Sequence, residues 1–327
     1  MKAVAHTGRD IASLTDIELP KPGPGPRDLL VKVEAVSVNP VDTKQRKTDT
    51  PSPRVLGWDA AGTVAAVGAQ VTLFKPGDAV YYAGDVTRPG SNSEFHLVDE
   101  RIVGRKPKTL DFAHAAAIPL TAITAWEAFF DRMKVASGRS VLIINGAGGV
   151  GSIGIQIAKC AGLRVIATAS RPETIAWVKE LGAEHVVDHR RPLRPQLEAL
   201  GLKHVDYVAN FSGELDNHWP AMADIVAPQG AVLAIVGNRD PLAMDVVRSK
   251  SASVCWELMF TRPRFQTPDM IEQHKLLNAV AEWLDAGKLR STLRETLSPI
   301  NGANLRRAHE KLESGTMIGK LVLHGWA

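Results

Sequence analysis

The sequence predicts an α/β protein in which a doubly wound parallel sheet is inserted into a mainly β unit. Three observations predict this fold class. A glycine turn follows an apolar strand in the middle of the chain, strands and helices alternate after that turn, and short β-rich runs broken by proline and glycine precede it. The first two are typical of α/β domains, and the third is typical of an irregular β unit.

The glycine turn lies in the stretch 140–151, which reads SVLIINGAGGVG. Residues 141–144 have the continuous apolar pattern of a buried parallel strand, and residues 153–162 continue with apolar residues at helical spacing. A GxGxxG sequence between a strand and a helix predicts a dinucleotide-binding turn. The alternative is a glycine-rich turn that binds no ligand.

Each glycine of the turn has an expected task. Gly146 is expected to make the tight turn, Gly148 to let the backbone approach a pyrophosphate, and Gly151 to let helix and strand pack closely. Gly149 and Val150 begin the helix, where free N–H groups and the positive end of the helix dipole favour phosphate. All five residues are therefore predicted to bind the cofactor.

Strand-like runs continue after the turn, with helix-like stretches between them. They lie at 163–170, 183–188, 205–211, 230–237 and, as the expected last strand, 251–260. This alternation predicts a parallel sheet with right-handed crossovers, a Rossmann domain at residues 113–253. Ligands bind outside the carboxyl ends of such strands, so Val236 and Gly237 are expected near the nicotinamide.

The end of the second strand indicates which dinucleotide binds. A site for NAD would carry Asp or Glu there to hold the ribose 2′-hydroxyl, whereas this chain has Ser170 and Arg171. A hydroxyl and a guanidinium suit a 2′-phosphate. His189 and Arg190 follow the third strand and could flank the same phosphate, so we expect NADPH. Alternatively, Arg171 is a solvated charge and Glu173 reaches the ribose.

Composition fits a soluble two-domain enzyme. The chain has 327 residues, of which 45% are hydrophobic and 23% charged. The net charge of +4 is too small to indicate a nucleic-acid partner. No apolar run is long enough for a membrane span or a signal peptide, so we expect no membrane partner and a cytoplasmic protein. Cys160 and Cys255 are expected to be buried small hydrophobes.

The remaining segments are expected to form one discontinuous domain. Residues 1–112 contain the irregular β unit. Residues 254–327 contain helices near 274–287 and 302–314 and strands near 293–297 and 319–325, which need a partner sheet. The N-terminal β unit is the obvious partner. A cleft between this domain and the Rossmann domain would then bind the substrate.

The chain resembles the medium-chain dehydrogenase/reductase superfamily over essentially its whole length, and within it the zinc-free quinone oxidoreductases and enone reductases. The resemblance implies a GroES-like catalytic domain and a nicotinamide cofactor. The matching segments are VSVNPVDTKQRK (36–47), VLGWDAAGTVAAVG (55–68), FKPGDAVYYAG (74–84), AAIPLTAITAWEAFF (116–130), the glycine turn and MIGKLVL (317–323).

The departures from the zinc alcohol dehydrogenases of this superfamily concern the metal. Asn39 stands where those enzymes have a cysteine, Trp58 and Asp59 stand where they have a His-Glu pair, and the four-cysteine structural zinc lobe is missing. Zinc needs three or four converging ligands, which these residue types do not supply. His185 and His189 are better interpreted as an exposed pair. We therefore expect no metal.

Without a metal, reduction of a conjugated acceptor is the expected reaction. Hydride arriving at a quinone or an α,β-unsaturated ketone leaves charge that spreads onto an oxygen, where one or two hydrogen-bond donors suffice. The expected substrate is a small quinone or enone. The alternatives are metal-free carbonyl or alcohol chemistry, and a non-catalytic NADPH-binding sensor or structural protein.

The resemblance and the residue types supply three candidate catalytic residues. Tyr82 matches a tyrosine of related quinone reductases and is expected to donate a hydrogen bond to the substrate oxygen, or else to pack structurally; the final proton could come from a side chain or from water. Asn39 matches a cleft asparagine that could bond the substrate oxygen or the cofactor ribose, or it merely forms a turn before Pro40. Thr124 resembles a threonine placed near the nicotinamide, and is otherwise an ordinary helix hydroxyl.

Four further residues are expected around the substrate. Asp42 is expected to orient its neighbours, Trp58 and Phe260 to form apolar wall, and Asn92 to rim the cleft. Phe260 could equally be core. We also expect a homodimer that pairs through residues 251–260, because an uncovered apolar edge strand is an aggregation risk.

Overall fold

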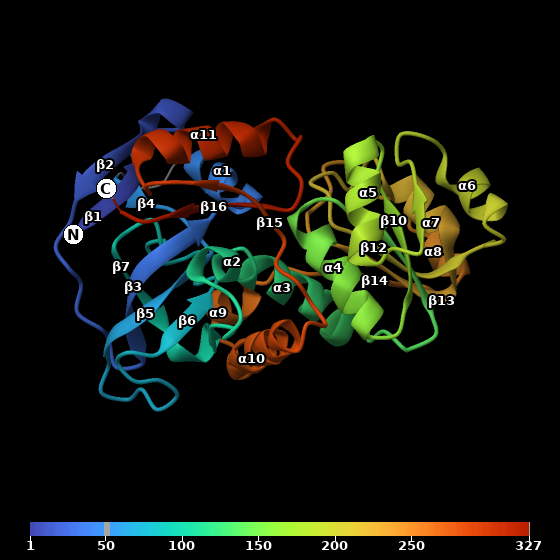
Figure 1. The fold of residues 1–327 in the computed structure, drawn as a ribbon. Coiled ribbons are helices and arrows are strands. Elements are labelled where there is room, and N and C mark those ends of the chain that lie inside the picture. Colours follow the sequence, from blue (N-terminus) through green and yellow to red (C-terminus); the bar gives the residue numbers. More distant parts are fainter. Residues whose placement is uncertain (49–52, 327) are drawn as a thin grey trace. The chain divides into compact units, whose positions relative to one another are not determined.

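The computed structural model describes residues 1–48 and 53–326, and the chain divides into two compact units (Figure 1). One unit combines Met1–Ile123 with Phe260–Ala327, and the other is Thr124–Met259. The expected boundaries at 113 and 253 differ from this division for physical reasons. Helix α2 (Phe112–Ala116) packs on strands of the first unit, and the strand that begins at Ser253 completes the sheet of the second.

The second unit contains the predicted doubly wound sheet, in the order β11-β10-β9-β12-β13-β14 with every neighbouring pair parallel. The chain adds strands on one side of β9 as far as β11 and then on its other side from β12 onward, which is the Rossmann arrangement. The strands are β9 (Ser140–Ile144), β10 (Arg164–Thr168), β11 (His185–Val187), β12 (Val205–Asn210), β13 (Val226–Ala234) and β14 (Ser253–Trp256). The last strand is shorter than the expected 251–260 because the chain turns away after Trp256.

Helices cover this sheet in two groups. Helix α4 packs on α5 and on β9 and β10, whereas α7 packs on α6, α8 and β13. The helices are α4 (Gly149–Cys160), α5 (Pro172–Leu181), α6 (Leu193–Ala199), α7 (Trp219–Ile225) and α8 (Asp245–Ser249). Between sheet and helices lies an apolar core that includes Leu142, Ile166, Val208 and Trp219. Burial of such side chains is the main stabilising contribution.

The first unit is built on the sheet β15-β16-β3-β5-β6-β8, with β7 also paired to β3, and on a smaller sheet β2-β1-β4. The return segment joins as expected, because β16 pairs antiparallel with β3 and β15 pairs with β16. The strands are β1 (Lys2–His6), β2 (Leu14–Glu18), β3 (Asp28–Ser37), β4 (Arg54–Val55), β5 (Ala60–Val67), β6 (Ala79–Tyr82), β7 (Phe95–Asp99), β8 (Val103–Arg105), β15 (Leu293–Leu297) and β16 (Lys320–His324).

Helices of the first unit connect and flank these strands. Helix α10 packs on β8, and α11 packs on α1 and β2. Their bounds are α1 (Pro40–Arg46), α2, α9 (Thr261–Phe265), α10 (Ile271–Asp285) and α11 (Gly302–Glu313), with short 3-10 helices η1 (Ile11–Ser13) and η2 (Glu100–Ile102). Helix α3 (Pro119–Trp126) contains the boundary between the units and continues as the π-helix η3 (Glu127–Arg132).

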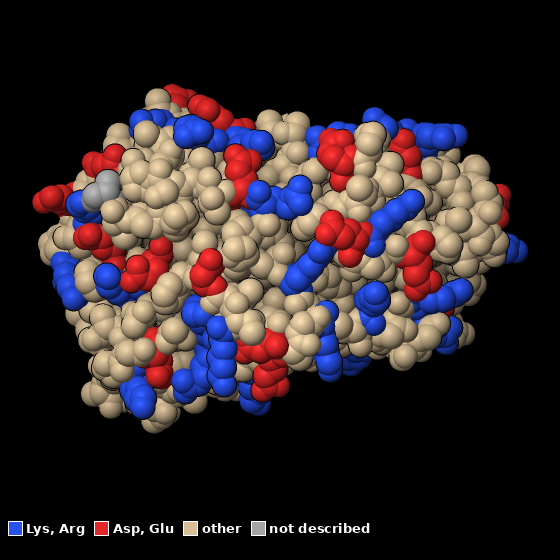
Figure 2. Space-filling view, viewed as in Figure 1, with Lys and Arg blue, Asp and Glu red and all other residues tan. Residues whose placement is uncertain are grey.

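Surface properties agree with the composition in most respects. On the face drawn in Figure 2, basic and acidic side chains are interspersed. Among the described residues, no helix has both the length and the apolarity of a membrane span. The prediction that both cysteines are buried is wrong for Cys160, which is exposed because the buried face of α4 ends before its last two residues. Cys255 is partly buried in the edge strand.

A buried pair of carboxyl groups lies beside that edge strand. Glu257 follows β14, Glu127 begins the π-helix, and neither side chain is exposed. Arg132 Nε lies 2.8 Å from Glu257 Oε2, and its Nη2 lies 3.9 Å from Glu127 Oε2. Burial, and next the neighbouring charge of Glu127, raise the pKa of Glu257 to about 9. The pair therefore holds a proton at neutral pH.

Because the folded chain holds this proton, its free energy of unfolding should depend on pH. The folded chain keeps the Glu257 proton from the ordinary glutamate pKa of 4.5 up to about 9, whereas the unfolded chain releases it. The free energy of unfolding therefore falls by roughly 1.4 kcal/mol per pH unit from this group over that range. Glu257→Gln is expected to lose this slope and to gain stability relative to the parent as pH rises. Urea unfolding of the parent and of Glu257→Gln at about pH 6 and about pH 8 measures this change in the free energy of unfolding. The exposed Glu184→Gln is the control, and parallel curves for the parent and Glu257→Gln would contradict the account.

Candidate functional site

The glycine turn of the second unit is tightly packed. A Cβ on Gly146 would lie 2.9 Å from Ala167 Cβ, and one on Gly151 would lie 2.2 Å from Asn145 O. A Cβ on Gly148 would lie 2.6 Å from Asn145 Nδ2. A side chain at Gly146 would push the turn away from β10, and one at Gly151 would push it away from α4, so close approach requires both glycines. At Gly148 the nearest atoms belong to the Asn145 side chain, which can move aside.

Asn145, rather than Gly146, has the left-handed backbone conformation of the turn, with φ of 62°. Its N–H donates to Thr168 Oγ1 at 3.0 Å, and its Nδ2 donates to Phe211 O at 3.1 Å. These bonds tie the turn to the carboxyl ends of two neighbouring strands. The tight turn expected at Gly146 therefore lies one residue earlier, at Asn145. The signal was present, because asparagine tolerates this conformation better than most residues.

The turn leads into a helix whose N-terminus is open. Gly148 is the N-cap of α4 and supplies no capping side chain, so no side-chain oxygen caps the first turn at Gly149 and Val150. The first N–H groups of a helix have no partner within it and attract anions. This end of α4 could therefore hold the pyrophosphate of a dinucleotide.

Two predicted phosphate-binding arginines lie at the same edge of the sheet. Arg190 Nη2 donates to Ser170 O at 2.6 Å, which joins the end of β11 to the end of β10. Arg171 Nε lies 3.2 Å from Glu173 in the first turn of α5. Asp188, which the sequence analysis missed, binds Arg190 Nε at 3.1 Å. The hydrogen bond from Arg190 lowers the pKa of Asp188, so the two side chains form an ion pair.

The structure places the other predicted residues of this unit as follows. His189 is exposed beside Arg190. Val236 and Gly237 follow β13, which ends three residues earlier than expected, at Ala234. Thr124 is buried in α3.

The first unit brings most of the predicted substrate residues around the loop before β5. Gly57 in this loop has φ of 109°, and a Cβ there would lie 2.6 Å from Asn92 Oδ1. Trp58 Nε1 donates to Asp85 O at 3.1 Å, and its ring meets Phe260 edge-on with centroids 6.4 Å apart. Trp58 and Phe260 are both buried. They form an aromatic pair, which fits a wall or a core equally well.

A buried polar cluster lies beside this loop and contains Asn39, Asp42, Asp59 and Lys320. Asn39 N–H donates to Asp42 Oδ2 at 2.6 Å, at the start of α1. Asn39 Nδ2 donates to Asp59 Oδ2 at 2.9 Å, and Lys320 Nζ donates to Asn39 Oδ1 at 2.5 Å. All four residues are buried. Burial raises the pKa of Asp42 to about 7 and also raises that of Asp59.

These contacts limit what Asn39 can offer a ligand. The lysine can only donate and the carboxylate only accept, so the amide orientation is fixed. Asn39 Oδ1 faces Lys320 and its Nδ2 faces Asp59. The second Nδ2 hydrogen is directed at Ser37 O and Trp58 O, both at 3.4 Å. Of the two predicted roles, accepting a bond from a cofactor ribose hydroxyl therefore fits better than donating one to a substrate oxygen.

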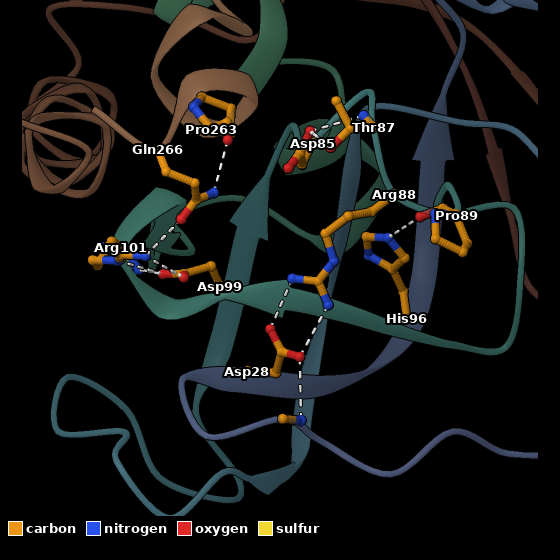
Figure 3. A network of polar contacts seen from close by, with 11 residues as sticks. Asp28, Asp85, Thr87, Arg88, Pro89, His96, Asp99, Arg101, Pro263 and Gln266 are labelled. Carbon is orange, nitrogen blue, oxygen red and sulfur yellow. Dashed lines mark hydrogen bonds and ion pairs between the residues drawn. The ribbon is translucent and has the colours of Figure 1, made fainter. Parts of the chain in front are cut away.

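Tyr82 lies on a buried histidine. Its hydroxyl is 3.0 Å from His96 Nδ1. Figure 3 shows the bond on the other side of the ring, where His96 Nε2 lies 3.0 Å from Pro89 O. Burial lowers the pKa of His96 to about 4, so the ring is neutral and carries one hydrogen. Pro89 O can only accept, which puts that hydrogen on Nε2 and leaves Nδ1 to accept from Tyr82. Tyr81, the preceding residue, donates to Leu277 O at 2.6 Å instead.

The bond to His96 leads to a prediction about Tyr82. Its only hydroxyl hydrogen is already donated, and burial raises its pKa, so loss of that proton to a product is disfavoured. A general acid contributes about 10²- to 10⁴-fold to a rate, whereas we expect Tyr82→Phe to lower kcat by less than about tenfold. Steady-state kinetics with NADPH and a quinone measures it. A loss of about a hundredfold with unchanged KM and Tm would restore the acid role.

A zinc ion does not fit the residues at the candidate metal positions. Asn39 and Trp58 supply neither thiolate nor imidazole, and Lys320 places a cation on the two oxygens that remain, those of Asn39 and Asp59. In the part of the chain that the structure describes, no three His, Cys, Asp or Glu side chains gather as metal ligands.

Comparisons with known proteins agree with this architecture. A family model described as zinc-binding dehydrogenase matches residues 181–323, and one described as the alcohol dehydrogenase GroES-like domain matches residues 25–108. A zinc-type alcohol dehydrogenase-like protein of Staphylococcus aureus (strain COL) is 45% identical over 311 residues, which cover 93% of this chain and 92% of that protein. The 2-methylene-furan-3-one reductase of Solanum lycopersicum is 33% identical over 310 residues, 90% of this chain and 71% of that protein.

Solved structures match the whole fold. A putative zinc-dependent alcohol dehydrogenase from Rhizobium etli CFN 42 has a TM-score of 0.96 and 55% identity, covering 100% of this chain and 98% of that one. A mycobacterial protein solved with NADPH has a TM-score of 0.87 and 27% identity, covering 99% and 100%.

A GroES-like unit joined to a Rossmann unit with a dinucleotide turn defines a nicotinamide-dependent oxidoreductase. The chain belongs to the medium-chain dehydrogenase/reductase superfamily. The family model carries zinc in its description, and the donor set of this chain departs from that description.

Proposed function

We propose that this chain is a zinc-independent reductase that transfers a hydride from NADPH to a quinone or an α,β-unsaturated carbonyl compound. The observation that carries the proposal is the polar cluster of the first unit, in which a lysine and not a metal holds Asn39 and Asp59. Without a Lewis acid, the favoured acceptor is one that spreads the arriving charge over a conjugated system. The similarity to a plant 2-methylene-furan-3-one reductase supports this substrate class.

The second unit would hold the cofactor. When bound, NADPH supplies the hydride from its nicotinamide ring. The open N-terminus of α4 would bind the pyrophosphate, and Arg171 and Arg190 would bind the 2′-phosphate. Arg190 would have to exchange Asp188 for the phosphate, which its exposed side chain allows. Val236 and Gly237 would contact the nicotinamide amide.

The chain's own groups then have modest tasks in the reaction. Asn39 would accept a bond from the ribose, Thr124 would contact the nicotinamide, and Asp42 would hold the Asn39 backbone. Trp58, Asn92 and Phe260 would shape the substrate pocket. Water supplies the final proton, because the Tyr82 hydrogen is bound to His96.

Turnover with matched acceptors tests the proposal. The purified full chain is mixed with NADPH and with a benzoquinone, an enone or a simple ketone, and NADPH loss is followed by absorbance. Oxidation with the quinone or the enone, at a rate above that with the ketone, is expected. Preference for the ketone would favour metal-free carbonyl chemistry. Measurable NADPH binding with no oxidation by any acceptor would favour a binding protein.

We propose in addition that the chain forms a homodimer through β14. This strand ends the sheet of the second unit, and Trp256 and Leu258 beside it are 46% and 47% exposed. An apolar edge of this kind is normally covered. Light scattering should give twice the chain mass of 35.3 kDa, and Val254→Pro, which removes a backbone donor from the edge strand, should shift the mass towards one chain. A monomeric mass for the parent chain would contradict the proposal.

A further inference from the structure

Lys320 is an unusual lysine because its side chain is buried in the first unit. It lies at the start of β16, within the apolar segment MIGKLVL, and is 1% exposed. Lysine is almost never fully buried unless its charge is paired. The contacts of Lys320 must therefore stabilise its buried charge.

Three acceptors surround the Lys320 Nζ atom. They are Asn39 Oδ1 at 2.5 Å, Val38 O at 2.9 Å and Asp59 Oδ2 at 3.0 Å. Each accepts a hydrogen, and an amine nitrogen carries three hydrogens only in its charged form. The geometry thus describes an ammonium ion whose hydrogens are all used.

Asp59 compensates this charge and is itself fully engaged. Its Oδ2 accepts from Lys320 and from Asn39 Nδ2, and its Oδ1 accepts the N–H of Leu120 at 2.8 Å. Neither residue of the ion pair is exposed to solvent beyond 1%. A buried pair of this kind is costly to break from one side, because the remaining charge loses its partner.

We propose that the ammonium of Lys320 is the resident cation of this cluster, which fixes the Asn39 amide for ligand binding and closes the cluster to divalent metal ions. A metal ion would need Asn39 Oδ1 and Asp59 Oδ2, the oxygens to which the ammonium is bound. Two cations on the same two oxygens repel each other strongly at such short range. Lys320 is a positioning residue that acts through Asn39.

Removal of the cation should have an effect that depends on Asp59. Lys320→Met leaves the Asp59 carboxylate buried without its partner, and we expect Tm to fall by about 10 °C. Lys320→Met combined with Asp59→Asn removes both charges, and most of that loss should be regained. The matched control is Lys44→Met, an exposed lysine on α1, which should leave Tm unchanged.

Metal binding is the readout that a merely structural lysine would not change. Zinc or cobalt(II) ions are added to each full-length variant, and bound metal is measured after dialysis together with Tm. The parent chain should retain no metal above the blank and show no change in Tm. In Lys320→Met, the vacated oxygens of Asn39 and Asp59 supply only two of the three or four ligands that zinc needs, so we expect weak binding of a metal ion whose other ligands are water molecules, seen as more metal retained than by the parent chain and a small rise in Tm.

Metal retention and Tm can be measured whether or not the chain is an active reductase, so failure of this proposal is distinguishable from failure of the proposed function. One equivalent of zinc retained by the parent chain, and lost in Asp59→Asn, would overturn the proposal. Equal losses of Tm in Lys320→Met and in the double variant would also overturn it. If Lys320→Met fails to fold while the double variant folds, the charge pairing is supported. If neither folds, metal retention by the parent chain and by Asp59→Asn decides.

Discussion

Gly151→Ala should abolish useful cofactor affinity, with the Kd for NADPH raised by more than about a hundredfold. The added Cβ would lie 2.2 Å from Asn145 O, a backbone atom that no rotamer change can move. The start of α4 and the turn after β9 would have to separate by about an ångström or more. A misplacement of about 1 Å costs about two orders of magnitude in a reaction rate, and we expect a loss of the same order in the binding of the phosphates at this turn.

The measurement is NADPH binding by calorimetry, with Tm recorded for the same samples. Overpacking costs roughly 1–3 kcal/mol, so the variant should still fold. Gly23→Ala is the control, because its Cβ would meet no atom within 4 Å. Unchanged affinity in Gly151→Ala would show that the turn does not hold the dinucleotide.

Replacing both Arg171 and Arg190 by alanine should remove the preference for NADPH. A hydrogen bond to a charged group contributes about 1.5 kcal/mol or more, so the loss of two should raise the Kd for NADPH by about a hundredfold. The Kd for NADH should stay within about threefold of that of the parent chain. The physical reason is that these guanidinium groups would contact only the 2′-phosphate.

Arg164→Ala controls for a general loss of positive charge. Arg164 is exposed at the amino end of β10, whereas Ser170 and Arg171 follow the carboxyl end of the same strand. It should leave both constants unchanged. Equal weakening of NADPH and NADH by the double variant would contradict the assignment of the 2′-phosphate site.

The fold was largely predictable because its main signals are periodic. Apolar strands alternating with helices predicted the parallel sheet, and the return segment needed a partner sheet, which β3 provides. The boundaries were less predictable, because α2 and the first part of α3 directly precede the Rossmann strands in the chain and nothing in their sequence separates them from that unit. Only tertiary contacts assign α2 to the first unit.

The candidate site was predictable in residue types but not in hydrogen bonding. The sequence pointed to Asn39, Tyr82 and the glycine turn, and the structure shows which atoms of each are already engaged. Asn145 could have been found from its position before a glycine. Lys320 and His96 could not. Lys320 lies on β16, far along the chain from Asn39, and His96 lies on β7, which does not pair with the strand of Tyr82, so only the folded sheet brings each residue to its partner.

The position to which the hydride is transferred distinguishes reduction of a conjugated acceptor from reduction of a carbonyl group. NADPH carrying deuterium on the transferred position of its nicotinamide is mixed with the purified chain and an enone, and with a quinone in a parallel sample. We expect deuterium at the carbon β to the carbonyl of the reduced enone, or rapid NADPH loss with the quinone, in protein that contains no zinc. Deuterium at the carbonyl carbon, or NADPH left unconsumed in both samples, would contradict it.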